Sequence, residues 1–402
     1  MPLMPVAEAL KRVLADARAL PDETVALNEA HGRVLTEDLS ALRTQPPAAV
    51  SAMDGYAVRA ADVAQAPVKL KLIGEVAAGH PFAGKVERGE AARIFTGGVM
   101  PVGADTVVIQ EVTTRDGDTV TIQKPTAKGR NVRACGIDFT QGEALLCKGR
   151  RLTDRDLMLA AAMNYPTLPV HRRPKIAVLG TGDELVAPGG KPTEGEIVYS
   201  NGFALMALAR GEGTEVSDLG IAPDRVEDIA AAVRRARDWG ADILLTSGGA
   251  SVGEHDLVQR ALASEGLALS FWRVALRPGR PMMHGRLGGM QVLGVPGNPV
   301  SSYVCAFLFL VPLIRRLAGR TDIEPIPEPA RLGRDLPAND ERADYMRATL
   351  AAGPDGPVAT PLPNQDSSLM APLAKADCLL IREPNAPFAA AGSPCVILKL
   401  GL

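Results

Sequence analysis

Apolar residues recur at helical spacing near the start of the chain, at Val6, Leu10, Val13, Leu14 and Ala17. This period predicts an amphipathic helix, which we expect to end near Pro21. From residue 50 to residue 137 the pattern changes to short β-rich runs separated by glycine, proline and aspartate turns: Val68–Glu75, Ala91–Phe95, Thr106–Gln110 and Thr119–Gln123. These runs predict a small, mostly antiparallel β-rich domain over residues 51–137.

Between residues 175 and 319, compact apolar runs alternate with helical patterns. The runs are Ile176–Leu179, Glu215–Ile221, Asp242–Thr246 and Gln291–Val295. Helical spacing between them appears at Val226, Ile229, Val233 and Ala236, and again at Leu257, Ala261 and Leu262. Strands without polar alternation that are separated by helices predict a parallel sheet buried on both faces. We therefore expect an α/β domain over residues 175–322, closed by a long helix from Val300 to Leu317.

The end of the chain changes character again. The segment Ile323–Pro329 contains three prolines and predicts a linker. After it come two strand-like runs, Ala376–Arg382 and Cys395–Leu400, bounded by proline- and glycine-rich turns. They predict a small C-terminal β domain over residues 323–402. The expected fold class is therefore a multidomain α/β protein.

Composition narrows the class of protein. A chain of 402 residues is expected to form two to four domains, and 46% hydrophobic with 22% charged residues is typical of globular proteins. A net charge of -2 argues against a nucleic-acid-binding protein but allows a local basic pocket. Five cysteines without a C-x-x-C spacing indicate neither a disulfide framework nor a zinc site. Charges interleaved through the first 20 residues argue against a signal peptide, and the apolar run 300–314 is shorter than the roughly 20 residues of a membrane span. We expect a cytoplasmic protein that binds neither nucleic acid nor membrane.

Glycine-rich loops follow three of the four predicted strands of the α/β domain, at Leu179–Glu184, Thr246–Gly253 and Gly294–Pro299. In open parallel sheets, ligands bind outside the carboxyl ends of the strands, where such loops lie. Glycine lets backbone N–H groups approach an anion closely. The loops therefore predict a phosphate or nucleotide pocket, although each one alone is also compatible with a tight turn. The candidate contacts are Gly180, Thr181, Gly182, Ser247, Gly248, Gly249, Ser251, Gly253, Pro296, Gly297, Asn298 and Pro299.

Acidic residues lie in or just after these loops, namely Asp183, Glu184, Glu254 and Asp256. Carboxylates would repel a phosphate unless a divalent cation bridged them, and Mg2+ prefers one or two carboxylates together with phosphate oxygens and water. Two acidic residues have an ordinary structural explanation as well. Asp256 precedes a predicted helix at Leu257, and Asp224 has Glu227 three residues later, which is a capping-box pattern. Either residue is therefore a helix cap or a site residue.

Arg273, Arg277 and Arg280 surround a proline–glycine turn. Such a turn can direct guanidinium groups at one oxyanion, although a run of charges is often only a solvated face. Two more segments, Ser51–Ala57 and Phe95–Asp105, contain Asp54 and Thr96, but their spacing alone indicates only structural turns. The five histidines form no H-x-x-x-H pair, and the chain has no Walker A lysine loop, G-x-S-x-G elbow or G-x-G-x-x-G fingerprint.

Several longer motifs occur in a fixed order. They are SAMDGYA at 51–57, IFTGGVMPVGADTVV at 94–108, GRNVRACGIDF at 129–139, GTGDELV at 180–186, SN at 200–201, TSGGASVGEHD at 246–256, LRPGRP at 276–281 and LGVPGNPVSS at 293–302. In this order the chain resembles the molybdopterin molybdenumtransferases of the MoeA type, which are related to the C-terminal E domain of gephyrin. The resemblance extends over essentially the whole chain.

The resemblance implies a fold, a reaction and an assembly. It implies insertion of molybdate into adenylylated molybdopterin with release of AMP, dependent on Mg2+. It also implies a homodimer whose N-terminal helical domain is discontinuous, formed by residues 1–50 and 138–174. The family's pocket lies between the α/β domain of one subunit and the β domain of the other. The molybdopterin adenylyltransferase, which shares the α/β domain, is a further expected partner.

The resemblance also assigns roles to particular residues. Asp54, Thr96, Glu184, Asp224 and Asp256 become catalytic candidates, with Glu184 and Asp256 as the metal ligands. Pro296 and Pro299 shape the third loop, and Arg347, Ser367 and Ser368 match a patch that helps to hold molybdate. One departure is that Arg273, Arg277 and Arg280 stand where many relatives have lysines, so a planar fork replaces a compact ammonium.

Two other functions compete with this one. The chain could catalyse the adenylylation step itself, because the α/β domain is common to both activities, but the β-rich and C-terminal domains argue against it. It could instead be a non-catalytic scaffold of the gephyrin type, which the carboxylates in the loops disfavour.

Overall fold

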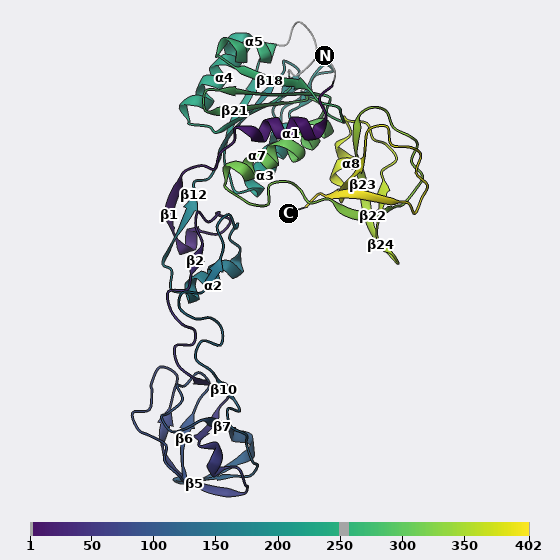
Figure 1. Cartoon of the computed structure of the whole chain (residues 1–402). Helices are drawn as coiled ribbons and strands as arrows, with labels where there is room; N and C mark the ends of the chain where they lie inside the picture. The colour runs from purple at the N-terminus through teal and green to yellow at the C-terminus, as the bar shows by residue number, and fades with distance from the viewer. Residues whose placement is uncertain (1–2, 249–256, 402) are drawn as a thin grey trace.

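The molecule is elongated and consists of four units. The computed structural model describes residues 3–248 and 257–401. Figure 1 shows a β-rich unit at one end, a small linker unit in the middle, and an α/β unit at the other end with a C-terminal unit beside it.

The α/β unit is built on one mixed sheet of six strands. Their order is β16 (Glu215–Ala222), β13 (Lys175–Thr181), β17 (Ile243–Ser247), β21 (Met290–Val295), β20 (Pro281–Leu287) and β18 (Ala268–Arg273). The first four are parallel, which confirms the predicted parallel sheet. The last two are antiparallel and extend one edge, so the sequence analysis missed β18 and β20.

Helices cover both faces of this sheet, which explains why its strands lack polar alternation. On one face lie α1 (Val6–Ala15), α3 (Asn201–Gly211), α6 (Pro299–Cys305), the π-helical η4 (Ala306–Leu310) and α7 (Val311–Leu317). On the other lie α4 (Val226–Asp238) and α5 (Leu257–Ser264). Val178 faces the first group and Leu179 the second. The first helix, which was expected in the N-terminal domain, instead belongs to this core, and it ends at Ala15, before Pro21.

The predicted long closing helix is present as α6, η4 and α7. The window Pro299–Leu317 is long and apolar enough to span a membrane, but 78% of it is buried inside the protein. We therefore interpret it as the central helix of the α/β core.

The linker unit is formed by two distant stretches of chain. The strand β1 (Asp22–Ala26) pairs with β12 (Thr167–His171), and β2 (Leu39–Ser40) pairs with β11 (Ala144–Leu146). The unit also contains η1 (Leu27–Glu29) and α2 (Asp154–Ala162), which begins with a capping box between Thr153 and Asp156. Leu35, Phe139 and Leu168 lie in its core.

The β-rich unit contains a six-stranded sheet. Its order is β7 (Thr106–Ile109), β4 (Gly55–Val58), β6 (Glu90–Ile94), β5 (Val68–Val76), β9 (Thr119–Ile122) and β8 (Thr113–Asp116). Only the β5–β6 pair is parallel, so the predicted mostly antiparallel sheet is confirmed. The remaining elements are β3 (Val50–Ser51), β10 (Val132–Arg133), η2 (Ala60–Asp62) and η3 (Gln110–Val112).

The C-terminal unit is also a β structure, as predicted. It contains β22 (Glu328–Leu332), β23 (Ala343–Gly353), β24 (Gly356–Pro361), β25 (Cys378–Arg382), β26 (Pro394–Lys399) and the short helix α8 (Met370–Ala374). Its first strand begins at Glu328, inside the predicted linker. A short strand from the α/β segment, β19 (Leu276–Arg277), pairs with β23 and ties the two units together. In the α/β segment, the two short strands β14 (Leu185–Val186) and β15 (Ile197–Val198) pair in parallel as a separate two-stranded sheet.

Candidate functional site

The three glycine-rich loops meet at one edge of the α/β sheet, because β13, β17 and β21 are adjacent parallel strands. Gly248 has φ +99, and a Cβ atom there would lie 2.3 Å from the carbonyl oxygen of Thr181. A Cβ atom on Gly297 would lie 3.7 Å from the Cα atom of Gly248. The loops therefore touch one another, and a side chain at position 248 would separate them.

Asn201, at the start of α3, connects two of these loops. Its side-chain amide donates to the Ser247 hydroxyl at 3.0 Å and to the Gly297 carbonyl at 2.7 Å. Asn201 belongs to the Ser-Asn motif of the sequence but was not predicted as a site residue. A signal was available, since an asparagine directly before a helical run can hydrogen-bond to a neighbouring backbone.

The carboxylates of the first loop take two different positions. A Cβ atom on Gly182 would lie 2.3 Å from Oε2 of Glu184, so the Glu184 side chain folds back over the loop. Glu184 is exposed and its carboxylate has no hydrogen-bond or ion-pair partner within residues 3–248 and 257–401. Asp183 instead accepts the backbone N–H of Asp224 at 3.0 Å. Asp183 thereby joins the first loop to the loop after β16, a role that the sequence analysis missed.

The capping interpretation of Asp224 is wrong. The N-cap of α4 is Arg225, and no side chain makes a cap hydrogen bond there. Glu227 is consequently the second helical residue, whereas a capping box needs the acidic residue at the third. The Asp224 side chain is exposed beside the first loop.

Asp54 and Thr96 form a hydrogen-bonded pair across 42 positions of sequence. Oδ1 of Asp54 accepts the backbone N–H of Thr96 at 2.7 Å and its hydroxyl at 2.9 Å. These bonds hold the pKa of Asp54 below its usual range, with a smaller contribution from the charge of Arg93. The pair lies in the β-rich unit, at the opposite end of the molecule from the glycine-rich loops (Figure 1). A single chain therefore brings Asp54 to Thr96 but not to the loops.

The three arginines of the proline–glycine turn do not share one role. Arg277 donates through Nε to Oδ1 of Asp344 at 2.6 Å and through Nη2 to Oδ2 of the same carboxylate. Its Nη1 lies 3.3 Å from Asp340. In this structure the guanidinium group of Arg277 is therefore held by two carboxylates, which the sequence did not predict. Arg273 and Arg280 have no carboxylate partner within the described part of the chain and keep their N–H groups available.

The C-terminal patch touches the third loop through Ser367. Its hydroxyl accepts from the Asn298 side chain at 2.9 Å, and its carbonyl accepts the N–H of Val300 at 3.0 Å. Ser368 donates to Asp366 at 2.7 Å.

Arg347 lies beneath this patch and is only 1% exposed. Its Nη2 donates to the Asn364 carbonyl, and its backbone N–H donates to the side chain of Gln365. Burial lowers the pKa of Arg347, and its Nε has no partner among the described residues. Arg347 and Gln365 thus support the segment that carries Ser367.

Part of the predicted site lies outside the described residues, namely Gly249, Ser251, Gly253 and Asp256. Among the residues that are described, no group of three histidine, cysteine, aspartate or glutamate side chains could hold a metal ion.

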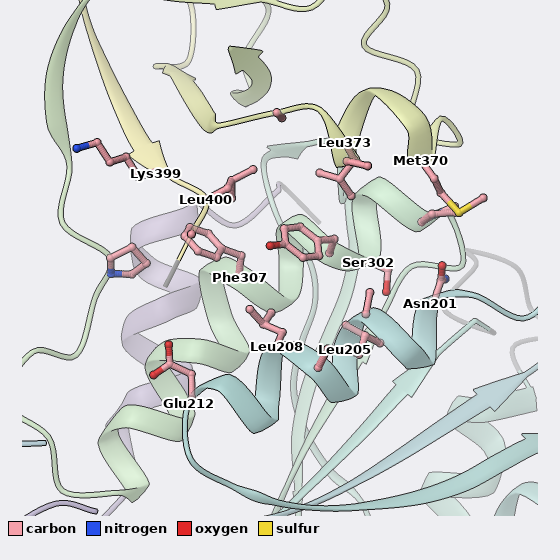
Figure 2. Close-up of a pocket in the computed structure, with 18 of the residues that line it drawn as sticks. Asn201, Leu205, Leu208, Glu212, Ser302, Phe307, Met370, Leu373, Lys399 and Leu400 are labelled. Carbon is pink, nitrogen blue, oxygen red and sulfur yellow. The ribbon is translucent and has the colours of Figure 1, made fainter. Parts of the chain in front are cut away.

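A cavity of about 880 Å³ opens beside the third loop. Figure 2 shows Asn201, Ser302 and Met370 at one end and Glu212 at the other, with Leu208, Phe307 and Leu400 between them. Its walls come from α3, the closing helix, α8 and the end of β26. The cavity lies where the C-terminal unit meets the α/β unit.

Residues 177–316 match the model of a probable molybdopterin binding domain, which defines the class of the α/β unit with its three loops. Residues 4–164 match the MoeA N-terminal region (domain I and II), and residues 329–400 match the MoeA C-terminal region (domain IV). The chain belongs to the MoeA family of molybdopterin molybdenumtransferases.

The similarity to relatives and to a solved structure extends over nearly the whole length of the chain. The chain is 34% identical to the molybdopterin molybdenumtransferase of Haemophilus influenzae, covering 94% of each chain. It is 35% identical to that of Synechococcus elongatus, covering 98% of each. Its structure is similar to the molybdopterin biosynthesis MoeA protein of Pyrococcus horikosii, with a TM-score of 0.83, 31% identity and complete coverage of both chains.

Proposed function

We propose that this protein inserts molybdate into adenylylated molybdopterin and releases AMP, as the names of its relatives suggest. The observation that carries the proposal is the contact of three glycine-rich loops at the carboxyl edge of one parallel sheet. Such an edge offers several backbone N–H groups to a phosphate bridge. The extra β-rich and C-terminal units disfavour the adenylylation step as the activity of this chain.

Glu184 and Asp256 are the residues that we propose as ligands of Mg2+. The chemistry of Glu184 fits, because its exposed carboxylate has no other partner within the described residues and Mg2+ needs only one or two carboxylates. When bound, the ion would neutralise the charge of the phosphate bridge. Asp183 keeps the Asp224 backbone against the first loop, so the two acidic loops stay together around the phosphates.

Molybdate, as substrate, is assigned to Arg273, Arg280 and the patch around Ser367 and Ser368. Neither guanidinium group has a carboxylate partner among the residues that the structure describes, and such groups suit a tetrahedral oxyanion. Ser367 connects the patch to the third loop through Asn298, so both substrates would meet at one edge of the sheet. Bringing two reactants together in fixed geometry is itself a source of rate.

The direct test is to mix the purified protein with adenylylated molybdopterin, Mg2+ and molybdate and to measure AMP. We expect AMP release that depends on molybdate. If the protein instead consumed ATP and adenylylated free molybdopterin, the adenylyltransferase interpretation would replace the proposal. An absence of both activities would favour a scaffold of the gephyrin type.

A homodimer is part of the proposal, because Asp54 and Thr96 lie far from the loops of their own chain. A second copy would place its β-rich unit against these loops. Sedimentation at micromolar concentration is expected to give about twice the mass of 42.2 kDa. A monomer with full activity would contradict the shared site.

We also infer a cytoplasmic location and a molybdopterin adenylyltransferase as the enzyme that supplies the substrate. Five cysteines, none of them in a disulfide, support a reducing compartment.

A further inference from the structure

Arginines accumulate where the linker unit meets the α/β unit. They gather around the C-terminal end of α3 and the last turn of α7: Arg33, Arg151, Arg173, Arg315 and Arg320. The carboxylates that pair with members of this group are Glu23, Glu212 and Asp322. The five arginines therefore share three ion-paired carboxylates, and Glu215 adds a negative charge near Arg173.

All three carboxylates already have arginine partners. The Glu212 side chain is 1% exposed and accepts from Arg315 at 2.8 and 3.0 Å and from Arg320 at 2.7 Å. Asp322 accepts both Nε and Nη2 of Arg320. Glu23 pairs with Arg33. Two guanidinium groups, those of Arg151 and Arg173, have no carboxylate within ion-pair distance in the described part of the chain.

Within the described residues, the guanidinium group of each of these two arginines makes a single hydrogen bond. Nη2 of Arg151 donates to the Gly211 carbonyl at 2.8 Å, and Nη1 of Arg173 donates to the Gly213 carbonyl at 3.0 Å. Carbonyls at a helix C-terminus favour cations, which accounts for these contacts. A guanidinium has five N–H donors, however, so most of the donors of both groups remain free.

Two glycines pack closely beside the two guanidinium groups. A Cβ atom on Gly32 would lie 3.8 Å from Nη2 of Arg151. A Cβ atom on Gly213 would lie 3.6 Å from Nη1 of Arg173 and 3.3 Å from the Gly32 carbonyl oxygen. The two glycines are thus neighbours, with one guanidinium against each. The next residue, Thr214, has a buried hydroxyl that also lacks a partner among the described residues.

The surplus charge is partly buried. Burial first, and then the charge of Arg320, lowers the pKa of Arg151. Burial and then the charge of Arg33 lower the pKa of Arg173, and Arg151 adds to this effect. Both groups remain protonated because arginine does not deprotonate in proteins. Glu212 and Asp322 offset part of the charge of Arg151, and Glu215 and Glu23 offset part of the charge of Arg173, but no carboxylate of the described residues lies within ion-pair distance of either group.

We propose that this junction binds a small tetrahedral oxyanion, of the class of inorganic phosphate or sulfate, between Arg151 and Arg173. Guanidinium forks match such anions in shape and charge. Arg151 comes from the linker unit, whereas the acceptor carbonyls belong to Gly211, the last residue of α3, and to Gly213 just after it, in the α/β unit. A bound anion would therefore tie the two units together and restrict the arm that carries Asp54 and Thr96.

The test is a calorimetric titration of the full chain with sodium sulfate, and separately with phosphate, at constant ionic strength. We expect saturable binding that becomes at least tenfold weaker in Arg151→Gln/Arg173→Gln. The matched control is Arg316→Gln, which removes an exposed arginine of α7 with no ion-pair partner among the described residues. The control should bind as the wild type does. Sulfate should also protect Arg151 and Arg173, read residue by residue by mass spectrometry, from modification by phenylglyoxal.

Three results would overturn the proposal. The first is protection confined to Arg273 and Arg280, which would assign the bound sulfate to the candidate site. The second is equal sulfate binding by the double variant and the control, which would leave the two arginines as helix caps only. The third is protection of Arg151 and Arg173 that depends on protein concentration and not on sulfate, because a carboxylate of a second copy would then be their partner.

Discussion

Replacing Glu184 by glutamine is expected to lower the rate of AMP release by roughly a hundredfold or more, the usual cost of removing one preorganised electrostatic contact. The substitution keeps the shape of the side chain and removes the charge that we assign to Mg2+. Its carboxylate folds over Gly182 and has no other partner within the described residues, so little stability should be lost. AMP release would be followed at saturating molybdate while Mg2+ is varied.

The control is Glu194→Gln, which removes an exposed carboxylate ten positions further along the chain. It should leave both the rate and the dependence on Mg2+ unchanged. If Glu184→Gln retained the wild-type rate over the whole range of Mg2+, Glu184 would not be a metal ligand.

Arg277→Ala and Arg280→Ala are expected to fail in different ways. Arg277→Ala should lower the free energy of unfolding by about 2 kcal/mol, because hydrogen bonds between charged groups are lost and Asp344 stays nearly buried without its partner. Arg280→Ala should leave stability unchanged and raise the molybdate concentration needed for full rate by roughly ten- to a hundredfold. Urea unfolding and molybdate titration of both variants would separate the two effects.

Asp344→Asn provides an independent control, because it weakens the same ion pair from the other side. It should resemble Arg277→Ala in stability. The assignment would be contradicted if Arg277→Ala were as stable as the wild type and needed more molybdate, since Arg277 would then act directly on the oxyanion.

The sequence alone determined the four parallel strands of the sheet and the position of the loops that follow three of them. Strands covered on both faces lack alternating polar positions, so Ile176–Leu179 and Gln291–Val295 were recognisable without the structure. Parallel strands also place their carboxyl ends at a single edge, which allowed the glycine-rich loops to be assigned to one site. Asp54 and Thr96 are different, since only the resemblance to a family joined them, and their spacing of 42 residues contains no physical signal.

Only the tertiary structure decided which polar side chains have a hydrogen-bond or ion-pair partner. Arg277 finds its carboxylate 67 residues away, through the pairing of β19 with β23. Asp224 is displaced from the helix cap by one position, because α4 begins after Arg225. The periodic patterns reflect burial, which acts along a whole element and leaves a repeated mark in the sequence. An ion pair or a bridging amide such as that of Asn201 forms between residues that are distant in sequence. Such a contact therefore leaves no local pattern in the sequence.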